Sequence, residues 1–86
     1  MTYQVNDILK GQFEGCFYQV IKTMGKKSMI VKRLQIERTD ETHIKPIKNK
    51  FVEGAKEWKG RLNQYGYIKL DMDHCQKWSG NPQYSF

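Results

Sequence analysis

The stretch between Phe17 and Arg38 constrains the fold most, because two runs rich in aromatic and β-branched residues flank a short polar segment with a glycine. The first run, FYQVIKTM, ends at Met24, and the second, MIVKRLQIER, begins at Met29. Residues of these types favour strands, and Gly25 in the intervening GKKS segment suits a tight turn. The pattern therefore predicts a β-hairpin.

The second arm of this hairpin carries apolar residues at alternate positions, which would face a core. These positions are Ile30, Leu34 and Ile36. Lys32 interrupts the series, so we expect either its long stem to lie along apolar surface or a bulge to change the parity.

The remaining chain supplies further short extended segments. Gln4 to Leu9 resembles a first strand, and Gly11 and Gly15 provide a turn into the hairpin. The segment ERTDETHIKP, ending at Pro46, is expected to be a polar loop. The region from Phe51 to Leu62 could form either a short helix or extended structure. Its two internal glycines disfavour a helix, so we expect extended structure with a turn at Gly54.

The segment QYGYIKLDM gives the clearest alternating pattern. One face would carry Ile68, Leu70 and Met72, and the other Tyr65, Tyr67, Lys69 and Asp71. After it, a turn over Ser79 to Pro82 separates Trp78 from Tyr84. We expect Trp78 and Tyr84 to fold back onto the first strand near Ile8 and onto the hairpin near Val20.

About five short strands with glycine turns predict a mainly β fold, a strongly bent antiparallel sheet or SH3-like barrel with at most one short helix. The 86 residues are enough for a single domain, 1–86. No apolar run is long enough to span a membrane, and the first residues lack a secretory signal pattern, so a cytoplasmic protein is expected. Cys16 and Cys75 are accordingly expected to be buried free thiols rather than a disulfide.

Several chemical functions lack a pattern in the sequence. Asp71, Asp73, His74 and Cys75 are close together, but the adjacent His and Cys would point to opposite faces of a strand, and no second ligand pair follows. His43 could partner Cys75 as a base, yet no third group is evident. No phosphate-binding glycine loop occurs. We therefore expect no enzyme activity, metal, cofactor or small-molecule substrate.

The charge distribution points instead to a macromolecular partner. Fifteen Lys and Arg residues against nine Asp and Glu residues give a net charge of +6. Basic residues interleaved with aromatics suit nucleic acid, because rings stack on bases and cations contact phosphates. The candidate binding residues are Lys26, Lys27, Lys32, Arg33, Tyr65, Tyr67 and Lys69. An equally simple alternative is a half-solvated sheet whose lysines and tyrosines cover the core.

The order of motifs resembles a group of small, uncharacterised proteins of bacteriophages and other mobile elements, with the pattern V-G-D-I, F-Y-Q-V, V-x-x-x-F and W-D-G-K-P-x-Y. The matching positions are Asp7, Ile8, Phe17 to Val20, Phe51, Trp78, Gly80, Pro82 and Tyr84. Asn6 replaces the family's Gly, and Ser79 and Asn81 replace its Asp and Lys. The resemblance implies a phage-type origin, and hence location in a host cytoplasm, without supplying an activity.

Two functions follow as hypotheses. The first is a phage-type accessory protein that binds nucleic acid through a basic and aromatic sheet face. The second is a phage-encoded inhibitor that binds an acidic surface of a host protein, such as a component of a CRISPR-type defence complex.

Overall fold

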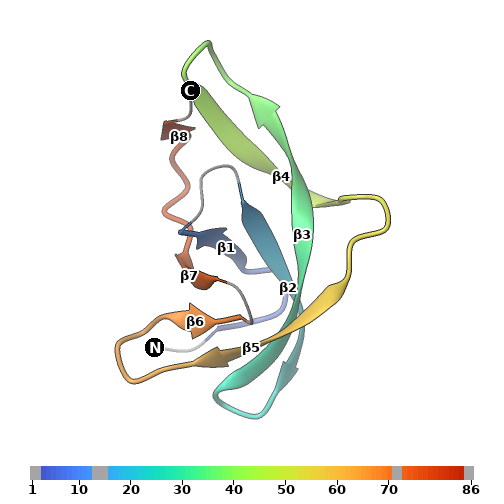
Figure 1. Ribbon diagram of the computed structural model, residues 1–86, viewed down its shortest axis with the longest axis vertical. Helices are drawn as coiled ribbons and strands as arrows, with labels where there is room; N and C mark the ends of the chain where they lie inside the picture. Colours follow the sequence, from blue (N-terminus) through green and yellow to red (C-terminus); the bar gives the residue numbers. More distant parts are fainter. Residues whose placement is uncertain (1–2, 13–15, 71–72, 85–86) are drawn as a thin grey trace.

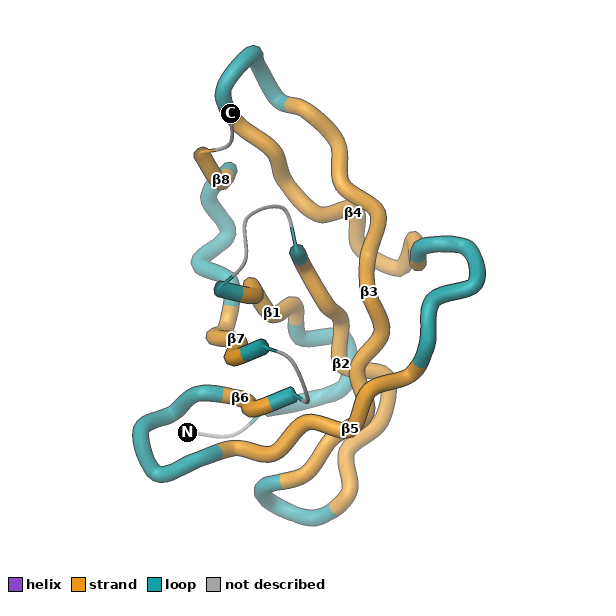
Figure 2. The backbone as a smooth tube through the Cα atoms, viewed as in Figure 1, coloured by secondary structure: helices purple, strands orange, loops and turns teal. Residues whose placement is uncertain are grey.

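The computed structural model describes residues 3–12, 16–70 and 73–84, with residues 83 and 84 described by their backbone alone. All of its regular elements are strands, as Figures 1 and 2 show, and no helix occurs in the described part of the chain. The strands are β1 (Ile8–Gly11), β2 (Phe17–Met24), β3 (Ser28–Arg38), β4 (His43–Phe51), β5 (Glu57–Leu62), β6 (Ile68–Lys69), β7 (His74–Lys77) and β8 (Gln83–Tyr84).

Six of these strands close into an antiparallel barrel in the order β2-β1-β7-β6-β5-β3, and β3 pairs back with β2. The long β3 continues past the barrel and pairs with β4, which pairs with β8 at His43 and Ile44. In Figure 1 this extension forms the upper part of the molecule, above the barrel strands. The prediction of a small β-barrel is confirmed, while the predicted number of about five strands is too low.

The predicted hairpin is confirmed, with β2 and β3 joined by a turn in which Gly25 has φ 76°. The predicted extended structure after Phe51, with a turn at Gly54, is also confirmed, and Gly54 has φ 75°. Positive φ values at both positions explain the glycines, because other residues are strained there.

The core is divided between the two faces of β1 and β2. The barrel interior contains eight buried residues: Tyr3, Leu9, Val20, Met29, Val31, Ile68, Leu70 and Cys75. A second cluster of Phe17, Leu34 and Ile44 lies on the other face, where Ile8, Phe51 and Trp78 pack against it. Because adjacent side chains on a strand point to opposite faces, Phe17 and Val20 belong to different clusters.

This division corrects the predicted core face of β3. Met29 and Val31 face the barrel interior, whereas Leu34 has the opposite parity and is buried in the second cluster. Ile36 is 40% exposed. The sequence pattern assumed one core on one face, but β3 contributes to a different core in each half.

Three other boundaries differ from prediction. β1 begins at Ile8, because Asp7 and Gln4 form a turn in which the Gln4 amide donates to the Asp7 carboxylate at 2.9 Å. The predicted polar loop ending at Pro46 instead enters β4 at His43. Gly66, at φ 86°, interrupts the predicted strand from Gln64 to Met72, so β6 spans only Ile68–Lys69. Asp71 and Met72 lie outside the described residues.

The C-terminal segment packs partly as predicted. The Trp78 amide donates to the Ile8 carbonyl at 2.9 Å, and its ring meets Phe17 edge-on at a centroid distance of 6.0 Å. Trp78 therefore contacts the predicted first strand, but Phe17 rather than Val20 is its neighbour in the hairpin. The predicted packing of the Tyr84 side chain concerns a group that the structure does not describe.

Candidate functional site

Arg61, Lys69 and His74 form one row across β5, β6 and β7. Arg61 pairs with Lys69, and Lys69 pairs with His74. Directly paired residues of antiparallel strands share a face. Since the neighbouring Ile68 and Cys75 are buried inside the barrel, the row points outward, and all three of its side chains are exposed.

The same outer face extends along each strand by steps of two residues. It also reaches β1, where Lys10 pairs with Gln76. We call this surface the basic-aromatic face and define it by Lys10, Lys59, Arg61, Tyr67, Lys69, His74 and Gln76. The residues of β1, β5, β6 and β7 include one acid, Glu57. It lies on this face at the far end of β5, beyond Lys59. The face therefore has a strong excess of positive charge.

Five of the seven candidate residues predicted from sequence lie on or beside this face, one of them, Lys32, at its far end next to Glu57. Tyr67 and Lys69 belong to it, and Lys26 and Lys27 lie in the adjoining turn. That turn is held to β5 because the Leu62 amide donates to the Lys27 carbonyl at 2.7 Å. The structure thus brings together basic residues from both the hairpin turn and the later strands.

Lys32 continues the outer face beside Glu57, whereas the other two candidate residues, Arg33 and Tyr65, lie elsewhere. The Lys32 ammonium is 5.5 Å from the centroid of the Phe51 ring, in cation–π geometry, and Lys32 pairs with Glu57. Arg33, the next residue on β3, points to the opposite face. Tyr65 lies in the turn before β6 and is 74% exposed. It does not share a continuous strand face with Tyr67 and Lys69, which corrects the prediction.

Lys59, Arg61 and His74 were not among the predicted site residues. Lys59 and Arg61 alternate with Trp58, Gly60 and Leu62 in the sequence EWKGRL, so applying strand alternation to this segment, which was predicted to be extended, would have found both. His74 required the pairing of β6 with β7. The sequence alone does not give that register.

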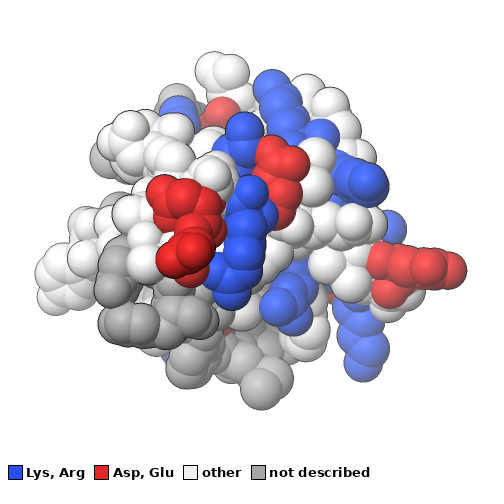
Figure 3. Space-filling view, turned by 90° about the horizontal axis from the view of Figure 1, so that it is seen from above, with Lys and Arg blue, Asp and Glu red and all other residues white. Residues whose placement is uncertain are grey.

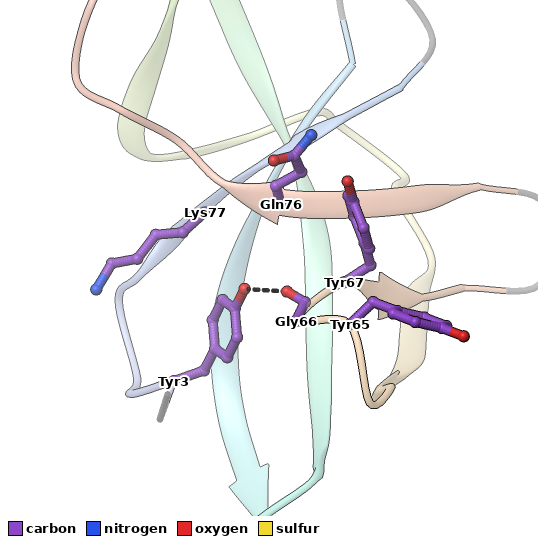
Figure 4. A pocket seen from close by; sticks show the side chains of 6 residues that line it. All are labelled: Tyr3, Tyr65, Gly66, Tyr67, Gln76 and Lys77. Atoms are coloured by element: carbon purple, nitrogen blue, oxygen red, sulfur yellow. Dashed lines mark hydrogen bonds between the residues drawn. The ribbon is translucent and has the colours of Figure 1, made fainter.

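A small pocket opens at the rim of the barrel beside this face (Figure 4). It has a volume of about 210 Å³ and is lined by Tyr3, Tyr65, Gly66, Tyr67, Gln76 and Lys77. The Tyr3 hydroxyl donates to the Gly66 carbonyl at 3.1 Å. In Figure 4 the Tyr67 ring rises beside Gln76, whereas the Tyr65 ring points away from Tyr3. The Lys77 ammonium is 3.6 Å from the Asp7 carboxylate.

Both cysteines are free thiols: Cys75 is fully buried on the interior side of β7, whereas Cys16 directly precedes β2 and is only half-buried, which corrects the predicted burial of Cys16. Burial, together with the nearby Asp73, raises the pKa of Cys75 to about 12, so its thiolate is scarce at neutral pH. Asp73 accepts hydrogen bonds at Oδ1 from the amides of His74 and Gln12, at 2.7 and 3.1 Å. Its buried Oδ2 has no hydrogen-bond partner among the described residues.

The predicted opposite orientation of His74 and Cys75 is confirmed: His74 is exposed and Cys75 is fully buried. Within residues 3–12, 16–70 and 73–84, no group of three or more His, Cys, Asp or Glu side chains is arranged to hold a metal ion. His43, considered from sequence as a partner for Cys75, is instead 3.0 Å from the Asp40 carboxylate at the start of β4.

The end of the molecule formed by the β3–β4 hairpin has a mixed surface charge. Figure 3 looks onto this end and shows acidic and basic side chains interspersed. Lys45 pairs with Glu37 at 3.1 Å. The Thr42 amide and the His43 ring lower the pKa of Asp40 to about 2 by hydrogen bonding to its carboxylate. Glu37 and Asp40 thus each lie next to a basic side chain, Lys45 and His43 respectively.

No protein-family model, curated protein or solved structure matches this chain. No helix in the described part of the chain has the length and apolar character needed to cross a membrane.

Proposed function

We propose that this protein binds nucleic acid through the basic-aromatic face. The observation that carries the proposal is the row of Arg61, Lys69 and His74 across three paired strands, with Tyr67 beside Lys69. Guanidinium and ammonium groups bind phosphate oxygens, and an exposed ring stacks on bases. Neighbouring strands are about 4.8 Å apart, so the row provides closely spaced contacts for a sugar-phosphate backbone.

The arrangement supports contacts to the backbone rather than recognition of sequence. The described cations of the face sit on short strands of a closed barrel, and the described chain has no helix to enter a major groove. Affinity should therefore come mainly from release of counterions. With Lys10, Lys59, Arg61 and Lys69 contacting phosphates, the logarithm of affinity should fall with the logarithm of salt with a slope of about −3 on single strands.

The test is fluorescence anisotropy with labelled oligo-dT, oligo-rU and a random duplex, titrated between about 50 and 200 mM salt. The double variant Arg61→Ala, Lys69→Ala should bind all ligands at least tenfold more weakly and with a shallower salt slope. The matched control is Lys48→Ala, Lys50→Ala, which removes two exposed cations from β4 and causes the same change in net charge.

The two double variants separate a local site from a general positive field. Equal losses in both would show that net charge alone attracts the ligand, and the proposal of a defined face would be wrong. Absence of any nucleic-acid binding at the lowest salt, together with a stable complex with one host protein, would favour the inhibitor hypothesis instead.

The phage-type origin belongs to the same proposal. It rests on the resemblance of the motifs around Asp7, Phe17 to Val20 and Trp78 to small phage proteins. The genes next to this one test it, because phage structural or replication genes should flank the coding sequence. A setting of host metabolic genes would contradict it.

A further inference from the structure

The rim pocket lies where the barrel meets the basic-aromatic face, and two residues, Tyr67 and Gln76, belong to both. From this overlap we infer that the pocket receives one unstacked base of a single-stranded nucleic acid, and that the protein consequently prefers single strands to duplexes. The inference rests on the proposed function and specifies its ligand.

The size of the pocket favours a single flat ring system. Its volume of about 210 Å³ is below the roughly 300 Å³ at which pockets for whole small-molecule ligands begin. Its lining also suits a base, because tyrosine rings provide faces for stacking and an amide provides a donor and an acceptor for a base edge. No described residue hydrogen-bonds to the Gln76 side chain, so the amide is available.

The pocket has one fixed wall and one adaptable wall. Tyr3 is 8% exposed and bonded to the Gly66 carbonyl, so its ring is held in place before any ligand binds. Tyr67 is only half-buried, and its backbone is fixed because its amide donates to Asn63 Oδ1 at 3.0 Å. A ring on a fixed backbone can adjust its side-chain torsions to stack on an entering base.

The distribution of charge around the pocket indicates the side on which the phosphates of a bound strand would lie. Lys77 is paired with Asp7, so that side is largely neutralised. Lys69 and Arg61 lie on the other side and have no ion-pair partner among the described residues. A strand whose base enters the pocket would therefore run its backbone over β6 and β5, along the row already described.

A base in a duplex has its faces covered by neighbours and its edge paired, so it enters such a pocket only after unstacking. A single strand offers bases without that cost. Stacking on one aromatic ring corresponds to about a tenfold change in affinity. The expected preference for a single strand over a duplex of equal length is therefore about tenfold or more.

The experiment compares oligo-dT, oligo-rU and a duplex of equal length for the parent, Tyr67→Ala, Tyr67→Phe and Arg61→Ala, Lys69→Ala. Tyr67→Ala should lose about tenfold in affinity for single strands and little for the duplex. Tyr67→Phe keeps the ring and should bind like the parent. The Arg61 and Lys69 variant should weaken binding to every ligand, which separates the phosphate row from the pocket.

A spectroscopic measurement on the parent protein avoids dependence on folding of the variants. Titration with thymidine monophosphate should shift the amide resonances of Gly66 and Tyr67 and move the base protons upfield, as expected for a stacked ring. Equal affinity for single strand and duplex with no effect of Tyr67→Ala would overturn the pocket inference while leaving the proposed function in place. Absence of all nucleic-acid binding would overturn both the pocket inference and the proposed function.

Discussion

The side-chain amide of Gln19 forms two hydrogen bonds with Asn49: Nε2 donates to Asn49 Oδ1, and Oε1 accepts from the Asn49 backbone amide, each at 2.8 Å. Nε2 also donates to Asn6 Oδ1 at 3.1 Å. Both asparagines have positive φ, 78° at Asn6 and 65° at Asn49. The buried side-chain amide of Gln19 therefore links two residues of left-handed backbone conformation from distant parts of the chain.

Replacing Gln19 by Leu should destabilise the fold by about 1 to 3 kcal/mol, because three hydrogen bonds of the buried Gln19 amide, to the backbone amide of Asn49 and to the side-chain oxygens of Asn49 and Asn6, would be lost. Gln19 is 1% exposed, so water cannot replace the amide without rearrangement. Urea denaturation followed by circular dichroism measures the free energy of unfolding. Gln64→Leu, at an exposed turn position, is the control and should change it by less than about 0.5 kcal/mol. Equal stability of the two variants would contradict the structural role.

Gln19 also explains why part of the sheet was beyond sequence prediction. Between the pairs Leu34–Phe51 and Ile36–Pro46, β4 carries extra residues that include Asn49, and this irregularity is held by the Gln19 side chain. Propensity and alternation describe a strand and its neighbours in sequence. They do not show that the side chain of Gln19, 30 positions away, accepts a hydrogen bond from the backbone amide of Asn49 in this irregular segment.

The hairpin of β2 and β3 was predictable because its signals are local: β-favouring residues and a glycine turn. β4 was missed because its first half is polar and contains Pro46. Proline is tolerated there since, among the described residues, β8 pairs with only His43 and Ile44 on the outer edge of β4. Of the site, Tyr67 and Lys69 were predictable from alternation, whereas the row with Arg61 and His74 depends on pairings between separate segments.

Trp78→Ala should lower stability by about 3 kcal/mol, at the lower end of the range for aromatic truncations because Trp78 is only half-buried. The variant loses the contact with Phe17 and the hydrogen bond from Nε1 to the Asn81 carbonyl at 2.8 Å. Thermal denaturation should show a sharp fall in melting temperature. Tyr65→Ala removes a 74% exposed ring and should melt like the parent. A Trp78→Ala protein that melts normally would mean that this residue does not hold the second cluster.

Gly60→Ala tests the packing of the barrel interior. A β-carbon at Gly60 would lie 2.6 Å from Ile68 Cγ2 and 3.0 Å from Leu70 Cδ2, both on the buried side of the barrel. Relief of this overlap should cost about 1 to 3 kcal/mol. Lys59→Ala, the exposed neighbour on the same strand, should stay within about 0.5 kcal/mol. Chemical denaturation of both variants decides the point, and a stable Gly60→Ala protein would show that β5 and β6 are farther apart than described.

Thiol labelling should distinguish the two cysteines. Burial raises the pKa of Cys75 to about 12, so at pH 8 only about one molecule in ten thousand carries its thiolate in the folded state. Cys16 is half-exposed and should account for the fast phase with a disulfide reagent. The Cys75 reaction should appear only in denaturant, or on raising the pH toward its pKa. Cys16→Ser should remove the fast phase, and rapid labelling that persists in this variant would place Cys75 nearer the surface.

Tyr3 and Gly66 are bonded across 63 positions of sequence, and the pocket that they line also needs Gln76 and Lys77 from β7. β7 pairs with β1, so the barrel closes only when two distant stretches of chain have met. Pairings of such long range are slow to form, because the entropy of loop closure is lost before the contacts contribute. A ligand that occupies the rim therefore binds only molecules that have completed closure, and it should slow their unfolding by mass action. Binding at the rim would then report that the barrel has closed, so the fraction of molecules that bind would measure the fraction that has reached the native state.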